Sequence, residues 1–162
     1  MVHALGKRGK IQWMPDHIWN LVRRYVPIPC IDVLLENSEG ETLLGWRRIP
    51  PYRNVWALPG GRLLKGERLE AAASRILADY DLSARQFFQV GVFPIRCPSR
   101  SDVSVCIAGL SPMGKAIPDG REFSSFRWTK QLPPKLGTNY RRMITRWHKM
   151  KSRPQALRFA RL

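Results

Sequence analysis

The sequence predicts an α/β fold in which helices cover both faces of a mixed β-sheet. Three observations support this prediction. Strand-like segments stand before and after a central helical segment, in the order β-β-β-α-β-β-β-α behind an N-terminal helix. The chain has 162 residues with 44% hydrophobic content, which suits one domain with a core. No apolar run reaches the length of a transmembrane helix, so a membrane partner is not expected.

The first half of the chain reads as a helix followed by strands. Residues 15–26 are expected to be helical because apolar residues recur at three- and four-residue steps: Ile18, Leu21, Val22 and Tyr25. Two apolar runs around a turn at Gly40 predict a hairpin over residues 29–48. Successive prolines predict a loop over 49–54. Residues 55–61 then predict a short strand that closes at a glycine pair.

The second half begins with a helix over residues 67–80, whose apolar positions have helical spacing: Leu69, Ala73, Ile76, Leu77 and Tyr80. Apolar runs predict strands over 87–95 and 102–110, and a further strand over 122–134 that ends at paired prolines. Residues 139–150 predict a last helix from the spacing of Tyr140, Ile144 and Trp147.

The charge is strongly positive, with 28 Lys and Arg against 12 Asp and Glu and a net charge of +16. No acid follows Glu122, and this last stretch carries eleven Lys or Arg. Such a balance favours polyanions, either nucleic acid or phosphorylated substrates. A merely solubilising basic surface is the alternative.

The cysteines indicate a reducing, cytoplasmic location. Cys30, Cys97 and Cys106 are scattered and form no C-x-x-C pair, so neither a disulfide framework nor a zinc site is expected. The N-terminal residues contain no apolar stretch of the kind that signal peptides carry.

A glycine pair leading into a helix is the first candidate site. Gly60 and Gly61 allow close approach of the backbone to a ligand, and helix N-terminal amides suit phosphate. Glu67 and Arg75 are about two turns apart and share a helix face, while Arg75 and Asp79 form an i,i+4 pair. This pattern predicts a phosphate or metal-phosphate site. The alternative is an amphipathic helix with a surface ion pair of little energetic weight.

These residues resemble the first half of the Nudix box, in which G-x5-E-x7-R corresponds to Gly61, Glu67 and Arg75. The segments "IDVLLENSEGETLLGWRR", "VWALPGGRLLKGERLEAAASRI" and "SSFRW" are similar to the GDP-mannose mannosyl hydrolase branch, over residues 27–133. The resemblance implies a Nudix α/β/α sandwich, a divalent metal such as Mg²⁺, a nucleoside-diphosphate sugar as substrate, and a homodimer.

The resemblance also implies roles for particular residues. The substrate-binding residues would be Asp32, Arg47 and Arg62. The metal contacts would come from Gly60, Glu67, Asp79 and Glu122. The catalytic residues would be Arg75 and Glu122. Metal and arginine would stabilise negative charge that develops on the leaving group.

Two key positions depart from the family pattern. Tyr80 stands where that branch has a metal-binding Glu, and Phe123 stands where it has the His that serves as general base. The histidines of this chain, His3, His17 and His148, lie far from that position in sequence. The expected metal affinity is therefore weak.

Two functions follow as hypotheses. The first is a hydrolase-like protein that binds a nucleoside-diphosphate sugar and hydrolyses it weakly with a metal. The second is an inactive module that binds RNA or a ribonucleoprotein through its basic ends, where Tyr140, Trp147 and Phe159 could stack on bases. Packing of the last helix on the core is the other role for these aromatics. Three segments of one globular domain are expected: a basic N-terminal segment and helix (1–26), a Nudix core (27–133) and a basic C-terminal helix and tail (134–162).

Overall fold

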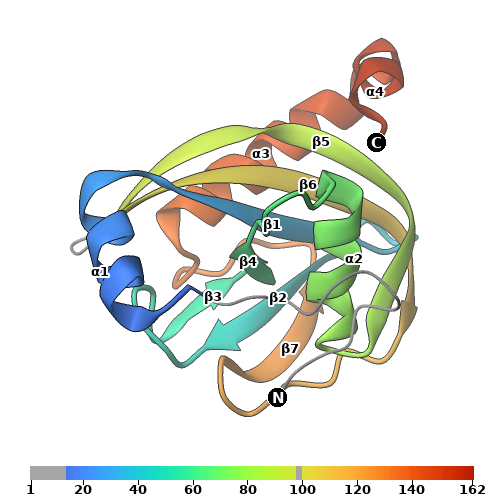
Figure 1. The fold of residues 1–162 in the computed structure, drawn as a ribbon. Helices are drawn as coiled ribbons and strands as arrows, with labels where there is room; N and C mark the ends of the chain where they lie inside the picture. Colours follow the sequence, from blue (N-terminus) through green and yellow to red (C-terminus); the bar gives the residue numbers. More distant parts are fainter. Residues whose placement is uncertain (1–13, 98–99) are drawn as a thin grey trace.

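In the computed structural model, which describes residues 14–97 and 100–162, seven strands form one mixed sheet (Figure 1). The strands are β1 (Ile28–Glu36), β2 (Thr42–Arg47), β3 (Val55–Ala57), β4 (Gly60–Arg62), β5 (Leu82–Cys97), β6 (Arg100–Gly114) and β7 (Phe123–Thr129). The main path runs β3-β2-β1-β6-β5, while β4 pairs with β1 and β7 pairs with β2. Only the β1–β6 pair of these strands is parallel. The predicted α/β architecture is confirmed.

In the part of the chain that the structure describes, four helices accompany the sheet: α1 (Asp16–Tyr25), α2 (Leu69–Ala78), α3 (Thr138–Lys151) and α4 (Pro154–Ala160). Figure 1 shows α2 in front of the sheet and α3 behind it. Helix α2 contacts β1 and β5, and α3 contacts β5. The sheet is therefore covered on both faces, as an α/β/α sandwich requires. No helix of the described residues is long and apolar enough to cross a membrane.

The core lies where the two helix layers meet the sheet. Strand β1 is buried along its length after Cys30, which matches a strand covered on both faces. Helix α2 buries Ala72, Ala73, Ile76 and Leu77, and helix α3 buries Tyr140, Met143, Ile144 and Trp147. Because Tyr140, Ile144 and Trp147 are buried, packing on the core accounts for these residues and base stacking does not.

Some local predictions were wrong. The glycine pair at 60–61 does not form a turn, because it belongs to β4, which pairs with the first half of β1. The expected hairpin over 29–48 forms only in part: β1 and β2 pair antiparallel near Glu36 and Thr42, and the rest of β1 pairs with β4 and β6. Helix α4 was not predicted, although its Pro at the first turn is a typical start. The basic segment 1–13 lies outside the described residues.

Candidate functional site

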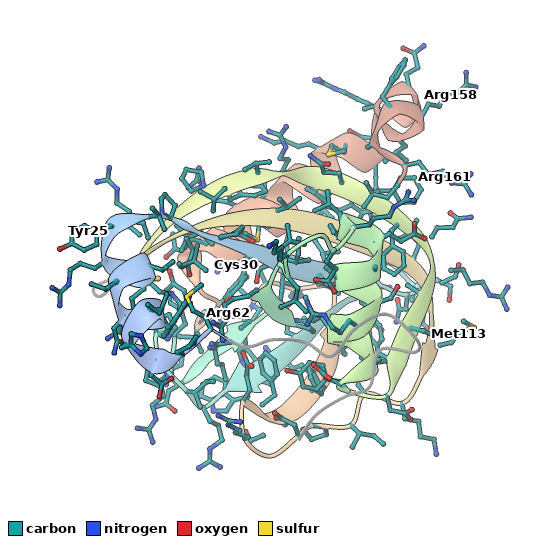
Figure 2. The ribbon with its side chains drawn as sticks, in the orientation of Figure 1. Tyr25, Cys30, Arg62, Met113, Arg158 and Arg161 are labelled. Carbon is teal, nitrogen blue, oxygen red and sulfur yellow. The ribbon has the colours of Figure 1, made fainter. Side chains whose placement is uncertain are left out.

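Strand pairing brings distant polar residues to one cleft of about 290 Å³. The β1–β4 register places Asp32 opposite Gly60 and Cys30 opposite Arg62. The β2–β7 register places Arg47 opposite Phe123, so Glu122 arrives beside Arg47. Five of the residues predicted from the sequence line this cleft: Asp32, Arg47, Gly60, Arg62 and Glu122. Figure 2 labels Cys30 on β1 and Arg62 on β4, on the side of the sheet where α1 lies.

Asp32 lies at the buried floor of the cleft, with 7% of its surface exposed. The hydroxyl of Ser104 on β6 donates a hydrogen bond to its carboxylate. Burial raises the pKa of Asp32 to about 6, and the Ser104 hydrogen bond and Arg47 limit the rise. A Cβ on Gly60 would come within 2.5 Å of Asp32 Oδ1, so the site requires glycine at this position. Asp32 can therefore change its charge near neutral pH.

Arg47 and Glu122 form an ion pair at the edge of the cleft, with Arg47 Nη1 donating to Glu122 Oε1. Arg47 Nε also donates to the carbonyl of Ile49, at 3.2 Å. The carboxylate of Asp119 accepts hydrogen bonds from the backbone N–H groups that precede β7, among them that of Glu122 at 3.0 Å. Burial raises the pKa of Glu122, and Arg47 opposes the rise. The ion pair therefore places the positive guanidinium of Arg47 and the proton-accepting carboxylate of Glu122 at one edge of the cleft.

Glu67 and Arg75 contact each other, as their spacing predicts, and both are largely buried. Arg75 Nε lies 2.7 Å from Glu67 Oε1, and Arg75 Nη2 lies 2.9 Å from Oε2. Burial by itself would raise the pKa of Glu67, but hydrogen bonds from Arg75 and from the backbone of Leu64 outweigh it and lower this pKa. Arg75 Nη2 also donates to the carbonyl of Arg62 at 3.0 Å. This pair therefore fixes the segment that carries Arg62.

Arg62 projects from β4 toward helix α1. Its guanidinium carbon lies 4.4 Å from the ring centroid of Trp19, which is a cation–π contact. Trp19 was not singled out from the sequence. The sequence did carry a signal for Trp19, because it lies three residues before Val22, one of the residues whose spacing predicts the helix over 15–26.

Arg100 and Asp102 also line the cleft, and sequence reasoning missed both. Arg100 Nε and Nη2 donate to Asp102 Oδ2 at 3.1 and 3.0 Å. Tyr52 and Tyr140 stand edge to face on another wall, with ring centroids 6.1 Å apart. The cleft therefore combines arginines with aromatic rings, a composition suited to phosphate and to a base or sugar ring.

The residues present do not fit a divalent cation. Tyr80 is buried, and its ring packs edge to face against Phe123 and Phe126, with centroids 5.4 and 5.1 Å apart. Glu67 is paired with Arg75, Glu122 is paired with Arg47, and Asp79 is exposed. Within the described ranges, no three His, Cys, Asp or Glu side chains gather as metal ligands would.

Comparisons with known proteins agree with this fold. The model of the NUDIX domain matches residues 26–147. A candidate 8-oxo-dGTP diphosphatase of Bacillus subtilis is 32% identical over 115 residues, which cover 69% of this chain and 74% of that protein. The low-salt glycan biosynthesis protein Agl8 of Haloferax volcanii is 38% identical over 69 residues, 43% of each chain. The aligned stretch thus spans less than half of Agl8.

Solved structures show the same architecture. A MutT NUDIX hydrolase from Burkholderia pseudomallei superposes with a TM-score of 0.69 at 18% identity, covering 75% of this chain and 98% of that one. The NUDIX domain of NrtR from Shewanella oneidensis, solved with ADP ribose, has a TM-score of 0.61 at 22% identity, covering 76% and 88%. At these identities the similarity concerns the fold alone.

Proposed function

The chain belongs to the Nudix family, and from this premise we propose that it binds a nucleoside-diphosphate derivative in the cleft between β1, β2 and β4. A nucleoside-diphosphate sugar is the first candidate, because the sequence resembles the GDP-mannose mannosyl hydrolases. The observation that carries the proposal is that Arg47 and Arg62 line one cleft together with the buried Asp32.

The arginines supply the recognition of the diphosphate. A guanidinium presents a planar fork of donors that matches two phosphate oxygens, and its charge does not depend on pH. Arg47 already holds a carboxylate, that of Glu122, so a diphosphate would compete for the same donor group. Asp32 accepts hydrogen bonds at the floor of the cleft and suits a sugar or ribose hydroxyl.

Hydrolysis, where it occurs, would be slow. Phe123 offers no proton acceptor, so Glu122 is the group near the cleft edge that would take a proton from water. The loss of a well-placed general base typically costs about a hundredfold to ten-thousandfold in rate. Magnesium is a proposed weak cofactor at most, because the carboxylates do not converge on one point.

Calorimetric titration with GDP-mannose, ADP-ribose and 8-oxo-dGTP tests the proposal, followed by a product assay with and without Mg²⁺. Arg47→Gln should weaken binding of the preferred nucleotide by about tenfold to a hundredfold, the usual worth of a charge-assisted hydrogen bond. Arg142→Gln, a change of the same charge on the exposed face of α3, should leave affinity unaltered. Absence of binding by all three nucleotides would overturn the proposal.

The second candidate is an inactive Nudix-fold module that binds RNA through its basic ends. Two observations favour it: no acid follows Glu122, and the Phe159 ring of α4 is 94% exposed in a segment that also carries Arg158 and Arg161 (Figure 2). Such binding should weaken steeply with salt, at a log–log slope near −0.7 for each phosphate contact. Arg153→Gln with Arg158→Gln should flatten the slope. RNA binding without hydrolysis of any nucleoside-diphosphate sugar would favour this candidate over the first.

A further inference from the structure

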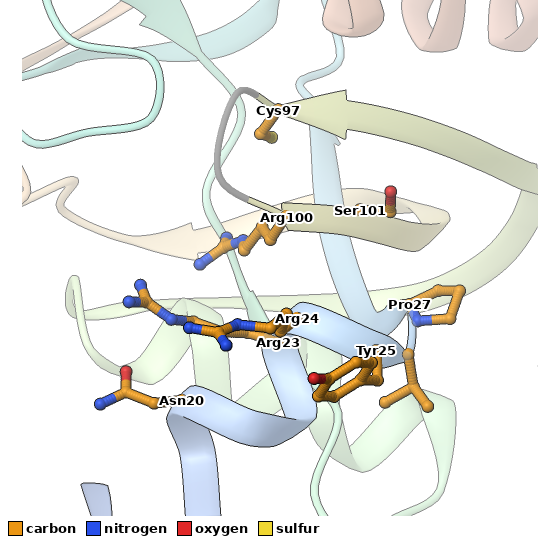
Figure 3. A pocket seen from close by; sticks show the side chains of 9 residues that line it. Asn20, Arg23, Arg24, Tyr25, Pro27, Cys97, Arg100 and Ser101 are labelled. Carbon is orange, nitrogen blue, oxygen red and sulfur yellow. The ribbon is translucent and has the colours of Figure 1, made fainter. Parts of the chain in front are cut away.

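A second cavity, of about 770 Å³, opens between the C-terminal end of α1 and the ends of β5 and β6. Its described lining residues are Asn20, Arg23, Arg24, Tyr25, Val26, Pro27, Cys97, Arg100 and Ser101. Three of these are arginines and none is Asp or Glu. Figure 3 shows Arg23 and Arg24 reaching from α1 toward the side of the cavity where Arg100 lies. The cavity is therefore a concentration of positive charge.

The donors of these arginines are available for a ligand. Arg23 and Arg24 are exposed, and neither takes part in an ion pair with another described residue. Arg100 is held by Asp102 through Nε and Nη2, while Nη1 donates to no described residue. An arginine fixed by a carboxylate loses little side-chain entropy when it binds an anion.

Arg100 connects this cavity to the cleft of the proposed function, because it lines both. Cys97 lies on one side of this junction and Cys30 on the other. A ligand held by Arg47 and Arg62 can therefore continue past Arg100 to the arginines of α1 without leaving the protein surface.

We propose that Arg23, Arg24 and Arg100 form a subsite for a further phosphate group, in addition to the diphosphate, of the nucleotide that occupies the main cleft. The preferred ligand then carries a phosphate beyond its diphosphate, either on a small nucleotide or in a short RNA that begins with a diphosphate. This inference rests on the proposed function, since the diphosphate is what places the ligand beside Arg100.

Paired ligands that differ by one phosphate test the subsite. Guanosine 5′-diphosphate 3′-phosphate should bind about tenfold more tightly than GDP, the gain expected from one charge-assisted contact. The double variant Arg23→Gln, Arg24→Gln should abolish that gain and leave GDP affinity unaltered. The control Arg85→Gln, Lys115→Gln removes the same charge at the ends of β5 and β6 that are opposite Cys97 and Arg100, and should retain the gain.

The outcomes separate the subsite from the function on which it rests. If GDP binds and Arg47→Gln weakens it, but neither the 3′-phosphate nor the dinucleotide adds affinity, the subsite is wrong and the proposed function stands. An equal loss of the gain in the Arg85, Lys115 control would also overturn the subsite, because the general electrostatic field of the protein would then explain the gain. If neither GDP nor its 3′-phosphate derivative binds, and GDP-mannose, ADP-ribose and 8-oxo-dGTP do not bind either, both proposals fail. A dinucleotide with a 5′-diphosphate distinguishes RNA from a small nucleotide as the ligand. A gain in affinity for the dinucleotide alone identifies RNA. A gain for guanosine 5′-diphosphate 3′-phosphate identifies a small nucleotide.

Discussion

The ring of Tyr80, two residues after α2, meets the ring of Phe123, at the start of β7, edge to face with their planes at 71°. In the GDP-mannose mannosyl hydrolase branch that the sequence resembles, these two positions are expected to hold a metal ligand and a general base. Here both positions carry aromatic rings, and Phe126 completes the cluster. We call Tyr80, Phe123 and Phe126 the aromatic cluster.

The two rings should be energetically coupled. In a double-mutant cycle of Tyr80→Leu and Phe123→Leu, the coupling energy should be about 0.5–1.5 kcal/mol, because edge-to-face pairs stabilise beyond the area they bury. Urea unfolding of the four proteins measures it. Tyr80→Leu combined with Ile144→Val on α3 is the control and should be additive. Additivity in the first cycle as well would contradict the contact.

Gly45 on β2 should tolerate no larger residue while Phe123 is present. A Cβ at position 45 would overlap the Phe123 ring. Gly45→Ala should therefore lower the free energy of unfolding by about 1–3 kcal/mol, as overpacking does in cores. The same change in a Phe123→Leu background should cost less, since the smaller side chain can move aside. An equal cost in both backgrounds would show that the ring is not the obstacle.

Magnesium should bind weakly, because the buried Tyr80 offers no anionic oxygen near neutral pH: burial raises its pKa further. Tyr80→Glu should lower the melting temperature without metal, since it buries a carboxylate beside two phenyl rings. Millimolar Mg²⁺ should restore part of that loss, while the control Tyr80→Gln and the native protein should not respond. Tight binding of Mg²⁺ to the native protein, measured by calorimetry, would refute this view of the site.

Asp32 should make stability depend on pH. Its folded-state pKa of about 6 is higher than its ordinary value of 3.8, so the folded protein binds more protons between these values. The stabilisation that the protonated Asp32 contributes is complete below pH 3.8, and it is lost as the pH rises through about 6. Relative to Asp32→Asn, the native protein should lose up to about 3 kcal/mol between pH 4 and pH 8. Denaturant unfolding at both pH values measures this, with the exposed Asp16→Asn as the control, and a constant difference would contradict it.

Lys151 should stabilise the protein through the buried Glu36. Lys151 Nζ lies 2.7 and 2.6 Å from the two carboxylate oxygens, and Trp147 Nε1 donates to one of them at 3.1 Å. Lys151→Met should cost about 1–3 kcal/mol, because it leaves a buried carboxylate without its cation. Lys149→Met, on the exposed face of the same helix, should cost little. If Glu36→Gln did not relieve the loss in the Lys151→Met protein, the pair would not be its cause.

The sequence predicted those parts of the fold that depend on local pattern. Helical periodicity was sufficient for α2 and α3, because each buries one apolar face. Strand β4 was missed because Gly60 and Gly61 resemble a turn, and only pairing with β1 makes them a strand. Helix α2 begins at Leu69, two residues later than predicted. Glu67 precedes the helix, and its carboxylate accepts hydrogen bonds from Arg75 and from the backbone N–H of Leu64.

The sequence indicated some of the residues that line the cleft, and it did not indicate the geometry of the cleft. The resemblance indicated Asp32, Arg47 and Arg62, but their meeting in one cleft depends on strand pairs that are remote in sequence. Arg100 and Asp102 belong to no motif, so only the three-dimensional arrangement reveals them. The contact between Tyr80 and Phe123 could likewise not be predicted, because no sequence pattern indicates that the end of the helical segment packs against β7.

The parallel pairing of β1 with β6 has a consequence for how the chain folds. Ile28 lies opposite Asp102, so the central strand finds its parallel partner only after most of the chain has been synthesised. Contacts this remote in sequence slow the folding of small domains, since a long loop must close before they form. Until β6 emerges, the apolar edge of β1 is open to pairing with other chains. Slow translation at low temperature should therefore raise the yield of native protein.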